Sequence, residues 1–200
     1  MKTTYPRPSA DTSRSGFTLL ELLIVISIIA ILAAIAFPAT SLVMTQARKA
    51  QAKTQAQGIV NAIKLYETQY AVLPLGNSPG EQQILTDQNF INILTGVDQD
   101  QNPKETVFIE GKVAKQAAGS KPARSGFVEE GGGSQSLVDP WGNPYVVIMD
   151  ADDDKQIKVP GIESPIRANA VAWSYGKPDK SSDHETARQN PPGKWQASWK

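Results

Sequence analysis

A run of 26 residues without a charged side chain, residues 22–47, constrains this 200-residue chain more than any other feature of its sequence. Residues 22–37 are almost wholly Leu, Ile, Val and Ala, and a helix needs about 20 such residues, at about 1.5 Å each, to cross a bilayer. The run therefore predicts a membrane-crossing helix. Glu21 stands at its start, and a carboxylate at the bilayer centre costs about 2.5–3.5 kcal/mol, so Glu21 is expected to have a charged partner.

Charges before the run predict its orientation. Lys2, Arg7 and Arg14 outweigh Asp11 there, which favours a cytoplasmic N-terminus and a C-terminal part across the membrane. A secretory signal peptide cut within residues 33–39 is the alternative. The length of the run argues against it, because the apolar core of such peptides is about 7–15 residues long.

The residues around Glu21 form a recognisable motif. R-S-G-F-T-L-L-E-L-L-I-V-I, residues 14–26, resembles the N-terminal motif of type IV pilins and of the pseudopilins of type II secretion systems, and Pro38 stands at the position usual in that family. The resemblance implies that a prepilin peptidase cuts after Gly16 and methylates the new N-terminus, Phe17. It also implies that Glu21 pairs with the free amine of the neighbouring subunit during filament assembly, which relieves two desolvation costs together.

The sequence predicts that the helix continues well past the apolar run. Residues 39–70 hold no proline and are rich in Ala, Gln and Lys, so one helix is expected from Phe17 to about Tyr70, kinked at Pro38. Apolar residues advance by three or four positions along its second half, and we expect this stripe to pack on the chain's own sheet. The stripe consists of Ala52, Ala56, Ile59, Ile63, Tyr66 and Tyr70.

The rest of the chain predicts a small antiparallel sheet. Residues 139–144 form a dense turn signal, and strands are expected at residues 145–149, 156–159 and 170–175, with an added edge strand at 195–199. One long helix followed by turn-joined strands indicates an α+β fold with three to four strands. Before the sheet, we expect a short helix at 82–94, an edge segment at 105–110 and a mobile surface loop at 112–133, which contains three consecutive glycines.

The expected organisation has five parts. They are a cleaved leader at residues 1–16, a transmembrane and assembly helix at 17–38, an amphipathic helix half at 39–72, a variable region at 73–138, and the sheet with a C-terminal loop at 139–200.

Two motifs in the second half extend the resemblance. D-P-W-G-N-P-Y, residues 139–145, is similar to the signature that opens the sheet in major pseudopilins. S-Y-G, residues 174–176, followed by Asp179, is similar to their S-x-G-x-D turn with one residue inserted. These motifs favour a pseudopilin over an adhesive pilin.

Carboxylates at alternate positions predict a candidate calcium site. Asp150, Asp152 and Asp154 follow a predicted strand, and a flexible loop with oxygen ligands suits Ca²⁺. A solvated acidic turn is the alternative, since Lys155 stands where a helix–loop–helix calcium site needs glycine. The resemblance implies a second arrangement around Asp179, although a later carboxylate of that family site is replaced here.

Composition narrows the function classes. The 20 basic and 20 acidic side chains cancel, so no overall field favours nucleic acid. The chain has no cysteine, and its one histidine, His184, lies in a polar run and is expected to be solvated. No nucleophile, metalloprotease or phosphate-binding motif is present, so we expect a protein without enzymatic activity.

The leading hypothesis is therefore a structural subunit of a type II secretion pseudopilus. It would be a single-pass protein of the bacterial inner membrane with its C-terminal domain in the periplasm, and its partners would be other pseudopilins, the prepilin peptidase and the inner-membrane secretion platform. One alternative is a type IV pilin for adhesion or motility. Another is a membrane-tethered or secreted enzyme or calcium-binding module with an ordinary signal sequence.

Overall fold

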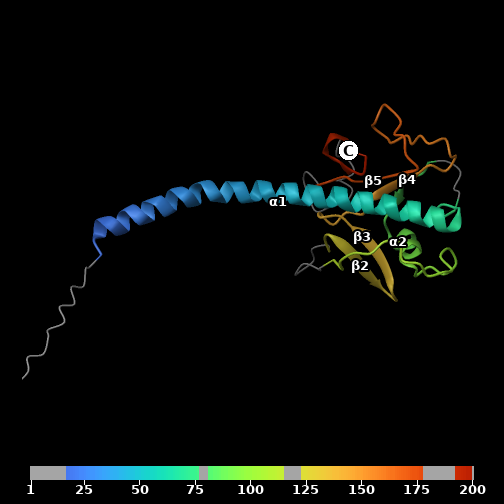
Figure 1. Cartoon of the computed structure of the whole chain (residues 1–200), viewed down its shortest axis with the longest axis horizontal. Coiled ribbons are helices and arrows are strands. Elements are labelled where there is room, and N and C mark those ends of the chain that lie inside the picture. The colour runs from blue at the N-terminus through green and yellow to red at the C-terminus, as the bar shows by residue number, and fades with distance from the viewer. Residues whose placement is uncertain (1–16, 77–80, 115–122, 178–191, 200) are drawn as a thin grey trace, which may run out of the picture. The chain divides into compact units, whose positions relative to one another are not determined.

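The computed structural model describes residues 17–76, 81–114, 123–177 and 192–199, and the side chains of residues 35–41 and 130 lie outside this description. The chain divides into two compact units, residues 1–44 and 45–200, and we call the second one the C-terminal unit. The described elements (Figure 1) are α1 (Leu19–Tyr70), β1 (Ile84–Leu85), α2 (Gln88–Thr95), β2 (Gly126–Gly131), β3 (Ser134–Val138), β4 (Val146–Met149), β5 (Ala170–Ser174), η1 (Pro192–Lys194) and β6 (Gln196–Ala197).

Helix α1 begins and ends close to the predicted positions. In the C-terminal unit five of the six residues of its apolar stripe are buried as expected: Ala52, Ala56, Ile59, Ile63 and Tyr66 expose between 0% and 2% of their surface. Tyr70, the last residue of the stripe, is half-buried. The stripe lies against the chain's own sheet, and the hydroxyl of Tyr145 donates to Oε1 of Gln55 at 2.7 Å. Because these contacts bury the stripe within one chain, it needs no coiled-coil partner.

The main sheet has four antiparallel strands in the order β1-β4-β5-β6. Strands β4 and β5 are buried on both faces, and alternate residues enter two different cores. Val147, Met149 and Ala172 pack with the stripe of α1, whereas Val146 and Trp173 join a second core that also holds Trp195. The α+β prediction, a long helix packed on an antiparallel sheet of four strands, is confirmed.

A second sheet was not expected. Residues 112–133 are predicted as a mobile loop, but β2 pairs with β3 in an antiparallel hairpin. Gly131, Gly132 and Gly133 form its turn with φ values of +92°, +61° and +84°, a region that suits glycine because it lacks a Cβ atom. The prediction was wrong because three glycines can close a hairpin as well as loosen a loop.

Three other predicted elements differ from the structure, and the first of them, the edge segment expected at 105–110, forms no strand. Residues 156–159 do not form a strand: Ile157 and Val159 are buried in alternation, but pairing is limited to one bridge between Ile157 and Ile166. The short helix predicted at 82–94 begins only at Gln88, because Asp87 caps it by accepting a hydrogen bond from the Phe90 N–H at 3.1 Å. The residues before it form β1 instead.

Candidate functional site

The beginning of α1 is closed by reciprocal hydrogen bonds between Thr18 and Glu21. The backbone N–H and the hydroxyl of Thr18 both donate to Oε2 of Glu21 at 2.9 Å, and the N–H of Glu21 donates to Oγ1 of Thr18 at 3.2 Å. This is a capping box, in which the residue before the helix and the third helical residue satisfy each other's backbone donors. Glu21 therefore has a partner inside its own subunit.

The spacing T-x-x-E before an apolar run is the sequence signal for such a cap, which was not among the predicted features. The cap leaves the predicted assembly role of Glu21 open. Both hydrogen bonds to the carboxylate are accepted by Oε2, so an amine from a neighbouring subunit approaching Oε1 is compatible with them.

Helix α1 carries a large exposed apolar surface directly after this cap. Phe17 exposes 80% of its surface, and the large apolar side chains from Leu19 to Leu32 expose 45–88%. Since these residues are nearly consecutive, the helix is apolar on every side here, which is typical of a segment that is covered by lipid or by other protein. Among the residues that the structure describes, no helix is both long and apolar enough to cross a membrane.

Three predicted site residues lie outside the described residues or side chains. Gly16, the predicted cleavage position, precedes the first described residue, and Asp179 falls in the undescribed range 178–191. The side chain of Pro38 belongs to the undescribed group within α1, so the predicted kink stays a prediction. His184, predicted to be solvated, also lies outside the described residues.

Asp139 is the centre of a buried polar network in the C-terminal unit. Its Oδ1 accepts hydrogen bonds from the N–H groups of Trp141 and Asn143, both at 2.8 Å. Its Oδ2 accepts from the Ser174 hydroxyl and, at 3.3 Å, from Nδ2 of Asn143. Asp139 and Ser174 are fully buried, and burial raises the pKa of the Asp139 carboxyl above its ordinary value while these four donors oppose the rise.

This network joins the two motifs of the second half. Asn143 donates through Nδ2 to the carbonyl oxygen of Gly176 at 3.2 Å, and the Gly176 N–H donates to the Ser174 hydroxyl at 2.9 Å. The turn before β4 and the turn after β5 are thus held together through Asp139, although they are more than thirty residues apart. The sequence identified both motifs but gave no indication that they touch.

The acidic turn after β4 gives the predicted calcium ligands different surroundings. Asp150 is buried and accepts hydrogen bonds from the N–H groups of Asp154 (3.2 Å) and Lys155 (2.9 Å), so it holds the turn itself. Carboxylate oxygens of Asp152 and Asp154 instead lie within 4.8 Å of each other and of an oxygen of Glu81.

Glu81 was missed because it lies far from the turn in sequence. Its Oε2 accepts a hydrogen bond from the Lys158 N–H at 2.9 Å, which fixes it beside the turn. Three carboxylates from two segments form a cluster of oxygen atoms of the kind that Ca²⁺ prefers. Binding of calcium here stays a prediction.

Comparisons with known proteins match both halves of the chain. A model described as the prokaryotic N-terminal methylation motif matches residues 11–37. The chain is 39% identical over 70 residues to the type IV major pilin protein PilE1 of Neisseria gonorrhoeae, and 38% identical over 68 residues to the type IV major pilin protein PilE of that organism. These alignments cover 35% and 34% of this chain, and 33% and 41% of the two relatives.

A third relative is matched over most of its length. The chain is 31% identical over 119 residues to the fimbrial protein EcpC of Eikenella corrodens, an alignment that covers 59% of this chain and 78% of that protein. The chain thus spans less than half of each Neisseria pilin but more than three quarters of the Eikenella protein. No solved structure gives a significant match.

Proposed function

The chain belongs to the type IV pilin-like family, whose members are structural proteins and not enzymes, and we propose that it is a subunit of a type IV pilus filament. In this proposal a prepilin peptidase cuts the chain after Gly16 and methylates Phe17. One observation carries the proposal: the matched methylation motif, residues 11–37, includes the start of a helix that exposes apolar side chains on every side. Copies of the chain would cover that surface in the filament.

The relatives favour a pilus over a secretion pseudopilus. Two of them are named as type IV major pilins and the third as a fimbrial protein. The sequence motifs alone favoured the pseudopilus, so the order of the two hypotheses is reversed here.

We keep the secretion pseudopilus as a second candidate because of one specific observation. The D-P-W-G-N-P-Y motif, which resembles the major pseudopilin signature, forms the buried Asp139 network and contacts the S-Y-G turn that resembles their second signature. Two resembling motifs in one hydrogen-bonded unit support a common architecture of this part of the fold.

We further propose that the subunit waits in the bacterial inner membrane before assembly. Residues 17–38 would cross the membrane once and leave the C-terminal unit in the periplasm. The charge-free run of residues 22–47 and its basic flank support this, and the run includes residues 35–41, whose side chains lie outside the described part of α1. Its partners would be other pilin subunits, the prepilin peptidase and an inner-membrane assembly platform.

Deletion of the gene tests the proposal and separates the two filaments. If the chain builds a pilus, the deletion strain should lose filaments that can be sheared from the cell surface, while its secreted proteins stay unchanged. If the chain builds a pseudopilus, secreted proteins should accumulate inside the cell and surface filaments should persist. Normal filaments together with normal secretion would contradict both.

A further inference from the structure

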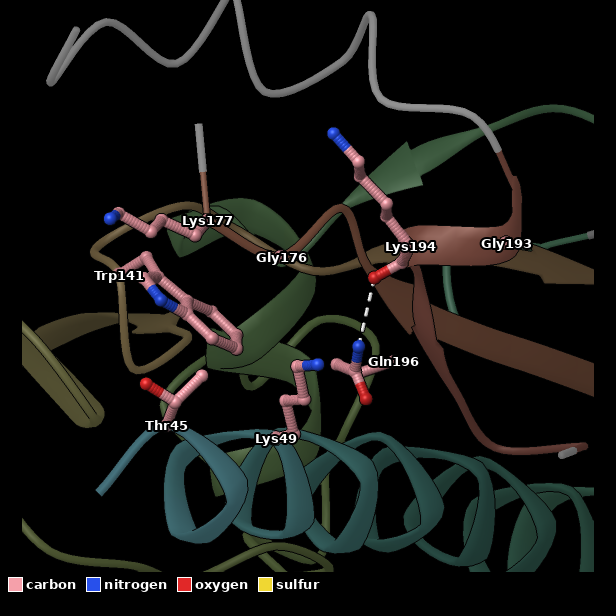
Figure 2. A pocket seen from close by; sticks show the side chains of 8 residues that line it. All are labelled: Thr45, Lys49, Trp141, Gly176, Lys177, Gly193, Lys194 and Gln196. Atoms are coloured by element: carbon pink, nitrogen blue, oxygen red, sulfur yellow. Dashed lines mark hydrogen bonds between the residues drawn. The ribbon is translucent and has the colours of Figure 1, made fainter. Parts of the chain in front are cut away.

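A pocket of about 350 Å³ lies at one end of the C-terminal unit, where the Asp139 network holds its walls together. Figure 2 shows the indole of Trp141 and the side chain of Lys49 facing the same space, with Gln196 beside them. Lys177 and Lys194 belong to the segments after β5 and before β6 that complete the lining. None of the residues that line the pocket is acidic.

The basic character extends beyond the pocket. Arg48 and Lys53 flank Lys49 on α1, and Arg124 precedes Ser125, whose hydroxyl lies 3.4 Å from Oε1 of Gln51. Asp139 lies close by, but it is buried and accepts four hydrogen bonds. We call the following six residues the basic end of the C-terminal unit: Arg48, Lys49, Lys53, Arg124, Lys177 and Lys194.

The opposite end of the same unit is acidic. Strand β4 connects the Trp141 turn to the turn of residues 150–155. In the same unit, the part of α1 from Lys49 to Glu67 is about 27 Å long, at 1.5 Å per residue. Glu67 interacts electrostatically with Lys155, and the hydroxyl of Tyr66 donates to the carbonyl oxygen of Gln101 at 2.7 Å, so two loops meet the last turns of α1.

These loops and the end of α1 carry more acids than bases. The acidic end consists of Glu67, Glu81, Asp98, Asp100, Glu105, Asp152, Asp153 and Asp154. Five basic residues lie among them: Lys64, Lys104, Lys155, Lys158 and Arg167, which lines one pocket together with Lys64 and Glu67. Eight acids and five bases leave a net charge of −3 there, against six positive side chains among the described residues of the basic end, of which Lys177 and Lys194 each take part in an interaction within the chain.

We propose that the acidic turn at residues 151–154 of one copy docks on the Lys49–Trp141 pocket of the next copy in the filament. A unit with oppositely charged ends cannot bind a second copy through like ends without repulsion, whereas the basic end of one copy complements the acidic end of another. Such a head-to-tail contact joins two different surfaces, and it repeats along a filament when its rotation does not close a ring. This inference rests on the proposed function as a filament subunit. Exposed charge pairs of this kind set register and partner choice more than overall affinity.

Cysteine cross-linking tests the contact, because the chain has no cysteine of its own. Filaments of the double variant Lys49→Cys/Asp153→Cys, sheared into buffer with a chelator so that no bound cation neutralises the turn, should give a ladder of disulfide-linked multimers after mild oxidation. The matched control is Lys49→Cys/Glu110→Cys, which keeps the first position and moves the second to an exposed acid outside the acidic end. It should stay monomeric on a denaturing gel.

Charge reversal tests the same contact without cross-linking. Lys49→Glu/Lys53→Glu and Asp152→Lys/Asp153→Lys should each lower filament yield severalfold, and a chain that carries all four changes should recover most of it. Equal melting temperatures of the purified variants and the wild type check that each one folds.

The outcomes separate this proposal from the one on which it rests. Filaments without the ladder, or reversal variants that assemble like the wild type, overturn the docking contact alone. A wild-type chain that enters no filament overturns the proposed function, and the docking contact with it.

Discussion

Glu21 has a task in the isolated subunit that is separate from any task in a filament. It completes the cap of α1 with Thr18, and Gln also serves at this position of a capping box. Replacing the charge and removing the cap are therefore two different experiments.

We predict that Glu21→Gln keeps the helix start and is cut after Gly16, yet fails to enter filaments. Its neutral amide leaves the neighbouring subunit's amine buried and unpaired, and breaking a buried ion pair costs about 3–5 kcal/mol. The measurement is the fraction of subunit recovered in sheared filaments. Thr18→Ala is the control: it removes a cap hydroxyl at a cost of about 0.5–2 kcal/mol to helix stability and should still assemble. Normal assembly of Glu21→Gln would reduce Glu21 to a capping residue.

Asp139 is the second residue with a distinct prediction. Because burial raises its pKa, the folded chain holds this proton more firmly than the unfolded chain does. Its contribution to the free energy of unfolding is therefore greatest at low pH and is lost as pH rises from the ordinary Asp value through the raised pKa. Asp139→Asn removes this pH dependence. The unfolding free energy of the wild type minus that of the variant should therefore fall as pH rises.

Denaturant unfolding of the full chain in detergent, at a series of pH values, provides the measurement. A difference that is constant or grows with pH contradicts the assignment. Asp139→Ala sets the scale: it leaves the N–H groups of Trp141 and Asn143 without their acceptor, and two unsatisfied donors at about 1–3 kcal/mol each cost about 2–6 kcal/mol.

At the scale of elements, the sequence predicted what rests on long periodic patterns. The stripe of α1 repeats over five turns and was found on the buried face, and the β-branched run that became β4 was correctly identified as a strand. Residues 156–159 show the limit of this reasoning: Ile157 and Val159 are buried in alternation, as they would be in a strand, but the pattern does not provide a pairing partner. Pro160 and Pro165, which lack the N–H that a ladder needs, flank the short paired region.

The candidate sites likewise divide into those that the sequence could predict and those that it could not. Motifs that are continuous in sequence, such as residues 14–26 and 139–145, could be read directly. Contacts between distant segments could not: Glu81 beside the turn of residues 150–155, and the Asp139–Ser174 bond, depend on how the sheet brings segments together. The carboxylate pattern in one loop therefore predicted Asp152 and Asp154 but not Glu81, which lies far away in sequence.

The acidic turn gives the prediction at this scale. If Glu81, Asp152 and Asp154 bind Ca²⁺, the full chain in detergent should melt higher in calcium than in chelator, with a stabilisation of about 2.7 kcal/mol at a hundredfold excess over Kd. Asp152→Asn/Asp154→Asn should abolish the difference, whereas Asp98→Asn, an acid outside the cluster, should keep it. Loss of the effect in Asp179→Asn instead would place the ion at the family position, and equal melting in calcium and chelator would exclude both.

At the scale of the whole molecule, the chain combines two kinds of surface. The start of α1 exposes nearly all of its described apolar side chains, whereas the C-terminal unit buries an apolar core and exposes charge that differs between its two ends. The first surface provides a nonspecific driving force for association, and the second can select how neighbours align. Both are properties of a subunit that functions in many copies.

The central claim is that this chain is processed as a pilin and then polymerises. The most direct measurement is the intact mass of the subunit recovered from sheared filaments, with sequencing of its N-terminal peptide. We predict a chain that begins at Phe17 and carries one methyl group on its amine. A mature N-terminus within residues 33–39, or filaments that lack this chain, would contradict the account.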